Sequence, residues 1–392
     1  MIESKFLFRG QGYDFIFAGT GCAALSIVMR MIKSGKFSGK KILLIDKEPK
    51  TKNDRTWCFW EKENGFFEEI VYKKWNKLSF FSDEFSDTMD ISPYEYKMIR
   101  GIDLYNYCFA EITKNKNIDI LYGNVTSILC DRGVSSININ NVTHRFEHAI
   151  VFNSFPKPEN TDSANSNKEI NLLQHFKGWI IETPHSVFDP GSALFMDFRV
   201  QQDRGTTFAY VLPFSKTMAL VEYTLFTKEI LKGEEYENEL KNYLKDFLKI
   251  EEYKIIEEEF GVIPMTTRTF DFYSGYTYFI GTAGGQTKAS SGYTFQFIQK
   301  QSENIVDYLI RNKDLTKLPR IPRRFLFYDK VLLDVLYNKR VTGKDIFTTL
   351  FKRNKPQQVL NFLDNETSLM KELKIISTLP TFPFLKSALK QF

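Results

Sequence analysis

Hydrophobic and polar positions near the N-terminus follow the order strand, turn, helix, strand. A buried strand is predicted from Asp14 to Ala18, and Gly19-Thr20-Gly21 forms the turn that follows it. Ala23 to Lys33 has a helical pattern with small residues in its first turn, and Ser34-Gly35 is its stop signal. Ile42 to Ile45 is a second buried strand. This βαβ unit predicts parallel strands and an α/β fold with helices on both faces of the sheet.

The middle of the chain has a different pattern. Four apolar runs joined by short turns lie between about Trp179 and Leu225, which is the spacing of an antiparallel sheet. A polar linker, residues 157–169, precedes them, and a charged helical segment, Glu234 to Glu252, follows. The chain then returns to strand, glycine loop and helix, and from Leu318 onward it is helical, aromatic and locally basic.

Composition and charge change this picture little. The chain of 392 residues is long enough for a sizeable core and two sub-domains. The aromatic share of 15% suits an apolar ligand, although an AT-rich genome explains it better. A net charge of +5 is small for this length and predicts no nucleic-acid partner. The four cysteines are far apart, and His144 and His148 fall in a turn and strand pattern, so no metal site is expected.

The chain carries no pattern of a signal peptide or of a membrane span. The apolar run near its start is short, and no segment approaches the roughly 20 apolar residues that cross a bilayer. We therefore expect a cytoplasmic protein that meets a membrane, if at all, from one face.

The first glycine turn fits the motif G-x-G-x-x-A of dinucleotide-binding proteins. Gly19 permits the tight turn, Gly21 lets the backbone approach a pyrophosphate, and Ala24 allows close packing of helix and strand. Asp46 ends the second strand at about the distance at which a carboxylate binds a ribose hydroxyl. This context predicts dinucleotide binding but does not separate NAD from FAD.

A second glycine loop, Gly281-Thr282-Ala283-Gly284-Gly285, favours FAD. It follows a strand and precedes a helix late in the chain, where the two-part FAD architecture returns to the flavin. We therefore predict a Rossmann-like two-part FAD-binding fold with an antiparallel β-sheet substrate domain and C-terminal helices. The predicted domains are residues 1–155 with 255–312 for FAD, 156–254 for the substrate, and 313–392 for the helical region.

Two short stretches leave alternatives open. In "LVEYT", Glu222 shares a strand face with Leu220 and Thr224, and the pattern alone favours a carboxylate on the solvent side of a sheet. In "NDRTWCFWE", Trp57 and Phe59 point to one side, either as packing against a neighbouring sub-domain or as the wall of a site for an apolar ligand.

Several stretches together resemble the lycopene β-cyclase family of bacteria and plants. They include "YDFIFAGTGCAAL…ILLIDKE", "NDRTWCFWE", "FMDFR", "LVEYTLF", "GVIPM" and "GTAGGQTKASSGYTF", in the order and at about the spacing of that family. The resemblance runs from about Tyr13 to the C-terminal helices. It implies a flavoprotein that binds reduced FAD, with NADPH as the reductant, and that closes the linear ends of lycopene into β-ionone rings without net redox change.

The resemblance also implies roles for individual residues. Glu222 corresponds to the proposed general acid, so the resemblance favours a buried carboxyl at this position. The residues predicted to bind FAD are Gly19, Gly21, Ala23, Ala24, Asp46, Lys47, Arg55, Thr282, Ala283, Gly284, Gly285, Gly292 and Tyr293. Those predicted to bind the substrate are Trp57, Phe59, Trp60, Asp197 and Tyr223. Tyr223 stands where many relatives carry a second acid, which favours a mechanism with a single carboxylate.

The expected partners are a linear carotenoid such as lycopene, a membrane surface and other carotenoid enzymes. The basic, aromatic C-terminal helices, with Arg323, Arg324 and Phe325 among them, are either a membrane-contacting surface or a solvated cap. Two other functions are weighed against the cyclase. One is an FAD-dependent monooxygenase or reductase acting on an isoprenoid lipid, against which Thr282 counts because such enzymes usually carry Asp there. The other is a non-catalytic carotenoid carrier.

Overall fold

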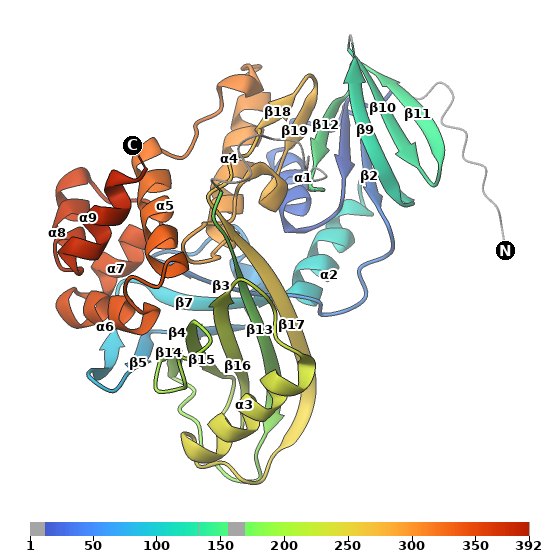
Figure 1. The fold of residues 1–392 in the computed structure, drawn as a ribbon. Coiled ribbons are helices and arrows are strands. Elements are labelled where there is room, and N and C mark those ends of the chain that lie inside the picture. Colours follow the sequence, from blue (N-terminus) through green and yellow to red (C-terminus); the bar gives the residue numbers. More distant parts are fainter. Residues whose placement is uncertain (1–11, 132, 156–168, 392) are drawn as a thin grey trace.

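The structure, a computed structural model, describes residues 12–131, 133–155 and 169–391. A six-stranded sheet forms one end of the molecule, and its strands are parallel except at the β18 edge (Figure 1). In spatial order the strands are β18 (Tyr273–Ser274), β19 (Thr277–Phe279), β12 (Ile150–Asn153), β1 (Phe15–Ala18), β2 (Ile42–Asp46) and β8 (Ile118–Tyr122). The helices α1 (Cys22–Ser34), α2 (Gly101–Ile112) and α4 (Phe295–Ile310) pack beside it. The predicted βαβ unit and the returning strand, loop and helix are confirmed.

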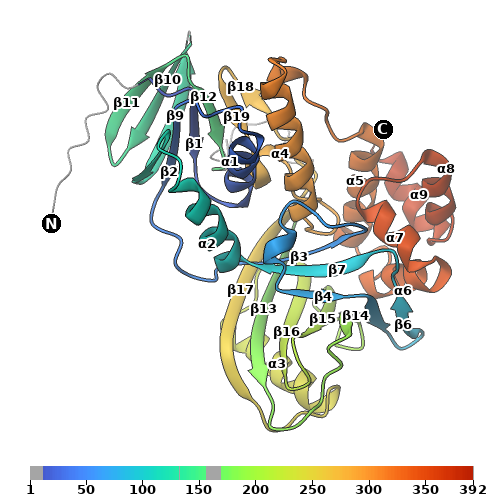
Figure 2. The same cartoon turned by 180° about the vertical axis from the view of Figure 1, so that it is seen from behind.

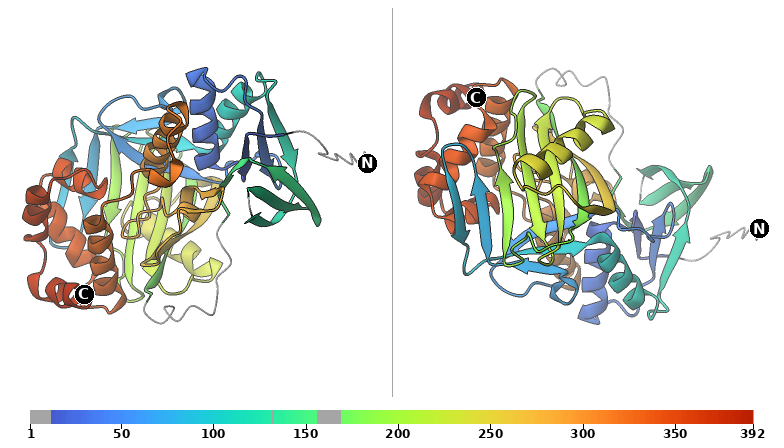
Figure 3. Two further views of the ribbon diagram at one scale, coloured as in Figure 1. Left: turned by 90° about the horizontal axis from the view of Figure 1, so that it is seen from above. Right: turned by 90° about the horizontal axis from the view of Figure 1, so that it is seen from below.

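A seven-stranded, mainly antiparallel sheet forms the second layer (Figure 2). In spatial order its strands are β17 (Lys254–Thr266), β13 (Asn171–Glu182), β16 (Met218–Thr227), β15 (Thr206–Pro213), β14 (Ser192–Asp197), β5 (Lys77–Phe81) and β6 (Ser86–Asp90). Its four middle strands correspond to the four apolar runs of the sequence. Helix α3 (Gly233–Asp246) covers one face, and the C-terminal helices lie along the other side (Figure 3).

The boundary between the two sheets differs from the predicted domain boundary at two places. β17 was expected in the FAD-binding domain, but it pairs with β13 along its length. β5 and β6 come from the same predicted domain, yet β5 pairs with β14 in parallel. Strand pairing is not local in sequence, so the alternation of apolar residues did not reveal these partners. The predicted linker lies outside the described residues except for Glu169.

A small three-stranded sheet lies between the two units. Its strands are, in spatial order, β3 (Thr56–Glu61), β7 (Glu95–Arg100) and β4 (Lys73–Trp75). Phe59 and Ile99 on one face join the core around α1 and α4, while Trp60 and Tyr96 on the other join the core of the seven-stranded sheet. This small sheet therefore connects the nucleotide-binding unit with the unit that carries Glu222.

The remaining described elements lie at the two ends of the molecule. A three-stranded antiparallel sheet packs near β2, and it is formed by β9 (Val125–Asp131), β10 (Val134–Ile139) and β11 (Val142–Glu147). The helical C-terminal region consists of α5 (Arg323–Tyr337), α6 (Gly343–Arg353), α7 (Pro356–Leu363), α8 (Leu369–Ile376) and α9 (Thr381–Leu389). Within the described ranges, none of the helices is both long enough and apolar enough to traverse a bilayer.

Candidate active site

The first glycine loop leaves the N-terminus of α1 open. Gly19 has a φ of +94°, and a Cβ atom there would lie 2.0 Å from the Ser154 Oγ, so only glycine fits. Gly21 caps α1 without a side-chain hydrogen bond, and the first turn carries no acidic residue. A Cβ atom on Gly21 would point into open space. Free amides and the positive end of the helix dipole thus face a space suited to a phosphate group.

The Asp46 carboxylate is hydrogen-bonded to the first glycine loop and holds it in place. Its Oδ2 accepts hydrogen bonds from the Thr20 backbone N (2.7 Å) and Oγ1 (2.6 Å), and its Oδ1 accepts from Lys50 Nζ (3.1 Å). Burial alone would raise the pKa of Asp46, but the hydrogen bonds from Thr20 and the charge of Lys50 lower it overall. The predicted contact of Asp46 with a ribose stays a prediction, because the structure occupies both oxygens within the protein.

The second glycine loop meets the first at the start of α1. A Cβ atom on Gly281 would lie 3.1 Å from the Ala23 Cβ, so the two loops are in close contact. Thr282, Ala283 and Gly284 form the single turn η3 (Gly281–Gly284), and Thr282 is exposed. The two sets of predicted FAD-binding residues therefore lie together, although they are far apart in the chain.

The segment after this loop is tied to the C-terminal helices. Lys288 is buried and donates to Asp329 Oδ1 of α5 (2.8 Å) and to Asn365 Oδ1 (2.8 Å). Ser290 Oγ donates to the same Asp329 oxygen at 2.6 Å. These contacts explain the lysine and serine of the "KAS" stretch as residues that fix the loop, a role that the sequence pattern did not indicate.

Lys47 and Arg55 bring exposed positive charge to the same region. Lys47 follows β2 directly, and Arg55 precedes β3. The Arg55 guanidinium influences the pKa values of both Cys22, at the start of α1, and Tyr105, so it lies near the first glycine loop. Two cations beside an uncapped helix N-terminus suit the phosphates of a dinucleotide.

Glu222 lies in a row of residues that crosses four adjacent strands. Tyr210 of β15 is directly opposite Glu222 of β16, which is opposite Gly178 of β13, which is opposite Glu259 of β17. Directly opposite residues point to the same face of a sheet, so both carboxyls and the Tyr210 side chain share one face. The Glu222 residue keeps a small exposed surface, but its carboxyl group is surrounded by protein atoms.

Burial raises the pKa of Glu222 well above its usual range, and hydrogen bonding to Glu259 and repulsion by its charge raise it further. Within the part of the chain that the structure describes, neither carboxyl forms an ion pair with a cation. A carboxyl in this setting keeps its proton near neutral pH and is a candidate general acid.

The surroundings of Glu222 are aromatic. Trp60 and Tyr293 contact each other edge to face, with ring centroids 4.6 Å apart, and Phe195 lies 6.0 Å from Tyr210. Burial is the main cause that raises the pKa values of Cys58, Tyr96 and Tyr210, and the nearby Glu222 carboxyl contributes for Cys58 and Tyr210. Tyr293 follows the second glycine loop in the chain, so the segment of residues 281–293 contributes both to that loop and to the aromatic surroundings of Glu222.

The two faces of β3 separate the residues of the "TWCFWE" block. Trp57 and Phe59 do share a face, as predicted, but that face packs against Phe295 of α4, with ring centroids of Phe59 and Phe295 4.3 Å apart. Cys58 and Trp60 point the other way, where Cys58 lies close to Glu222 and Trp60 contacts Tyr293. Of the three predicted aromatic residues, only Trp60 lies on the face of β3 that points toward the seven-stranded sheet and Glu222.

Asp197 and Tyr223, which were predicted to bind the substrate, lie on the opposite side of the sheet. Tyr223 is buried in the core under α3, because adjacent residues of a strand alternate between faces. Asp197 is fully buried, where it pairs with Arg199 (2.6 Å) and accepts a hydrogen bond from Tyr243 of α3 (2.8 Å). Tyr223 and Asp197 therefore hold α3 against the sheet, and Asp197 also fixes the turn after β14 through Arg199.

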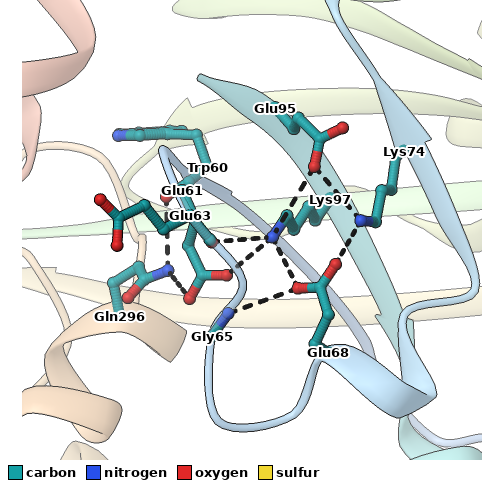
Figure 4. A network of polar contacts seen from close by, with 9 residues as sticks. All are labelled: Trp60, Glu61, Glu63, Gly65, Glu68, Lys74, Glu95, Lys97 and Gln296. Carbon is teal, nitrogen blue, oxygen red and sulfur yellow. Dashed lines mark hydrogen bonds and ion pairs between the residues drawn. The ribbon is translucent and has the colours of Figure 1, made fainter. Parts of the chain in front are cut away.

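The small sheet β3-β7-β4 buries a charged network around Lys97 on its face toward α4. Lys97 has no exposed surface, and its Nζ donates to Glu61 Oε2 (3.1 Å), Glu68 Oε2 (2.7 Å) and the Glu63 carbonyl oxygen (3.1 Å) (Figure 4). Gln296 of α4 donates to Glu61 Oε1 at 2.8 Å. The network anchors the loop after β3 to β7 and α4. Among the described residues, no group of histidines, cysteines and carboxylates is arranged to hold a metal ion.

Residues 14–389 match the family described as lycopene cyclase protein. No curated protein matches the chain by sequence.

Flavin-dependent enzymes are among the solved structures with a similar fold. A geranylgeranyl bacteriochlorophyll reductase-like protein from Thermoplasma acidophilum aligns with a TM-score of 0.59 at 11% identity, covering 96% of this chain and 98% of that one. The p-nitrophenol 4-monooxygenase from Pseudomonas putida aligns with a TM-score of 0.60 at 11% identity, covering 96% and 98%. The flavin-dependent brominase Bmp2 aligns with a TM-score of 0.60 at 12% identity, covering 91% and 94%. At these identities the likeness shows the fold, which is the predicted two-part fold of FAD-dependent enzymes.

Proposed function

The chain belongs to the lycopene cyclase family, and on that premise we propose that it is a lycopene β-cyclase. The proposed reaction closes the linear ends of lycopene into β-ionone rings, through γ-carotene to β-carotene, with no net oxidation or reduction. The observation that carries the proposal is Glu222. Burial and the neighbouring Glu259 raise the pKa of its carboxyl, and the side chain shares its sheet face with Tyr210, next to the aromatic residues Trp60 and Tyr293.

Glu222 supplies the proton that starts ring closure. Proton transfer from its carboxyl to C2 of the terminal alkene leaves a cation at C1, and C6 attacks C1 to close the ring. Loss of the C6 proton then forms the C5=C6 double bond. Trp60 and Tyr293 present ring faces and edges near the acid, where they shield the cation from water and stabilise it.

Reduced FAD is the proposed cofactor, with NADPH as the reductant. The residues fit the group: the two glycine loops meet at an uncapped helix N-terminus, and Lys47 and Arg55 add positive charge for its phosphates. When bound, a reduced and negatively charged flavin supplies negative charge that stabilises a carbocation.

The polyene chain beyond the reacting end is proposed to lie along the same face of β16. Phe226 shares that face with Glu222 and lies about 13 Å farther along the strand. A cleft of about 560 Å³ begins there, and Leu172, Phe226, Leu336 and Tyr337 are among its lining residues. In this proposal the hydrocarbon runs from Glu222 past Thr224 and Phe226 toward the cleft, and burial of its apolar surface supplies the binding energy.

Expression in lycopene-accumulating bacteria tests the proposed function. The wild-type chain is expected to change the extract from red to orange, with β-carotene as the product. Glu222→Gln, which keeps the shape of the side chain but cannot donate the same proton, is expected to leave lycopene unchanged while the purified variant still carries flavin.

The rival functions give other products. A monooxygenase or reductase changes the mass of the carotenoid, whereas cyclisation does not. A carrier never forms a ring, and it binds pigment equally well as the wild type and as the Glu222→Gln variant. Unchanged lycopene in cells that contain flavin-loaded wild-type protein would refute the cyclase.

We also propose that α8 and α9 contact the membrane in which lycopene dissolves. Both helices lie at the outer edge of the C-terminal region (Figure 1). Met370 and Phe382 are 78% and 76% exposed, and the lysines of the same helices are exposed as well. The residues first considered for this role differ: Phe325 is buried, and Arg324 pairs with the buried Glu372. An apolar surface flanked by lysines suits an anionic bilayer.

Sedimentation with vesicles tests this surface. The protein is expected to bind vesicles that contain phosphatidylglycerol more strongly than vesicles of phosphatidylcholine alone. The double variant Met370→Ser, Phe382→Ser should weaken binding about tenfold or more, because two large apolar side chains are lost from the contact. The control is Leu129→Ser on β9, which removes a leucine that is 68% exposed at the other end of the molecule. Equal loss in control and double variant would refute the assignment.

A further inference from the structure

We propose that Glu259 is the positioning partner of Glu222, and that the two form a carboxyl pair sharing one proton, with the proton on Glu222 and the charge on Glu259. This inference rests on the proposed function for its catalytic meaning, but the pair itself is a property of the protein. It adds a second carboxylate where the sequence favoured a single one.

Gly178 makes the pair geometrically feasible. It lies between the two glutamates in the row across β16, β13 and β17. A Cβ atom on Gly178 would lie 2.9 Å from Glu222 Cγ and 3.0 Å from Glu259 Cγ. The glycine therefore leaves the space through which the two side chains approach each other over the central strand.

Thr56 distinguishes the two carboxyls. Its Oγ1 donates to Glu259 Oε2 at 2.6 Å, and a hydrogen bond from a hydroxyl stabilises the charged form of a carboxylate. The other oxygen, Glu259 Oε1, is buried, and apart from the Glu222 carboxyl no described residue offers it a hydrogen-bond donor. A protonated Glu222 is therefore the donor to this oxygen, which assigns the negative charge to Glu259 and the proton to Glu222.

The other titratable groups around the pair do not neutralise it. Cys58 of β3, Tyr96 of β7, Tyr210 of β15 and Tyr293 of the loop all have pKa values raised first by burial, so they remain neutral where the pair titrates. No cation compensates a second negative charge among the residues described. Two adjacent ionised carboxylates are therefore strongly disfavoured.

This arrangement also accounts for the last step of ring closure. When the O–H bond of Glu222 breaks and its proton forms the new bond at C2, the pair carries two negative charges. The electrons of the C6–H bond then form the C5=C6 double bond, and the C6 proton returns to Glu222. The pair regains its single proton and its single charge, so atoms and charge balance without any further base.

Infrared spectroscopy of the flavin-loaded protein tests the pair. The wild type is expected to show the carbonyl band of a neutral carboxyl at pH 7 that is absent from Glu222→Gln. Glu259→Gln removes the neighbouring charge, so the band should disappear on titration at a pH lower by about one unit or more. The matched control is Glu258→Gln, which removes the same charge from the opposite face of β17, where Glu258 pairs with Lys177.

Two results would refute the proposed pair. One is a carbonyl band that titrates at the same pH in Glu259→Gln as in the wild type, and the other is a wild-type band that is still present in Glu222→Gln. Glu259→Asp, which keeps the charge but withdraws it, should give a smaller shift and carries the test where Glu259→Gln does not fold. The spectrum does not depend on turnover. A shifted band without β-carotene refutes the proposed function alone, and β-carotene with an unshifted band refutes the pair alone.

The pH profile of cyclisation gives a second measurement. The rate falls as pH rises through the pKa of Glu222, and this limb should move to lower pH in Glu259→Gln but stay in place in Glu258→Gln. A rate lowered by the same factor at every pH would mean that Glu259 only supports the structure.

Discussion

The two faces of the small sheet β3-β7-β4 bury charge in opposite ways. On the face toward α4, Lys97 is surrounded by carboxylates and a carbonyl oxygen at hydrogen-bonding distance. On the face toward the seven-stranded sheet, Glu222 and Glu259 lie together beside Cys58 and Tyr96, without a cation among the described residues. Adjacent residues of the same strands thus contribute to two very different environments.

The difference separates a structural role from a chemical one. Around Lys97 each charged group has a partner of opposite charge. The network therefore holds the loop after β3 in place, and its groups stay charged. Around Glu222 the compensation is incomplete, and the protein keeps a proton there instead of a counter-charge. A buried site that must keep a proton at neutral pH is suited to acid catalysis.

The largest expected effect concerns the acid. Glu222→Gln should lower the rate of ring formation by about 100-fold or more, because a positioned general acid contributes at least that much. Flavin content, measured by absorbance, should not change. If the Glu222→Gln variant cyclised lycopene at the wild-type rate, the face of the small sheet toward Glu222 would have no role in acid catalysis.

The next effect concerns the structural face. Lys97→Met should lower the free energy of unfolding by about 3–5 kcal/mol, because the fully buried ammonium is lost, Glu61 keeps no cation among the described residues, and Glu68 keeps only Lys74. Denaturant titration measures it. The matched control is Lys74→Met, which removes a cation of the same network that is 38% exposed and should cost less than about 1 kcal/mol. Equal losses of unfolding free energy in the two variants would show that the burial of Lys97 does not make it more important for stability than the exposed Lys74.

A smaller effect links the acid to stability. The folded-state pKa of Glu222 is raised, so the folded protein binds a proton that the unfolded chain releases, and stability falls as pH rises above the ordinary glutamate value. Glu222→Gln should therefore gain stability relative to the wild type by at most about 1.4 kcal/mol per pH unit until the raised pKa is passed. Thermal melts from pH 5 to pH 8 measure this gain. A difference independent of pH would contradict the raised pKa.

Local patterns predicted the parts of the fold that depend on neighbours in sequence. The strand, glycine turn and helix around Gly19 and the alternation along β16 are both found. The same alternation placed Leu220 with Glu222 on one face and Tyr223 on the other. Resemblance to the family predicted that Glu222 is the general acid, where the pattern alone favoured a solvated carboxylate.

Non-local pairing set the limit of prediction. Gly178, Glu222 and Glu259 meet because β16 and β17 both pair with β13, and no sequence periodicity reports which strands become neighbours. Glu259 stands in the run "EEEF", which has the composition of a solvated strand edge. For the same reason, the sequence did not indicate that Trp60, and not Trp57, lies on the face of β3 toward the seven-stranded sheet.

The central claim is that Glu222 gives a proton to a hydrocarbon beside a flavin. A single turnover in D2O tests it most directly, with flavin-loaded, reduced protein in excess over lycopene and oxygen excluded. Mass spectrometry of the first cyclised product should show one deuterium for each ring formed, located at C2, and no other change in mass. A ring without deuterium, or a product that has gained oxygen or two hydrogens, would contradict the account.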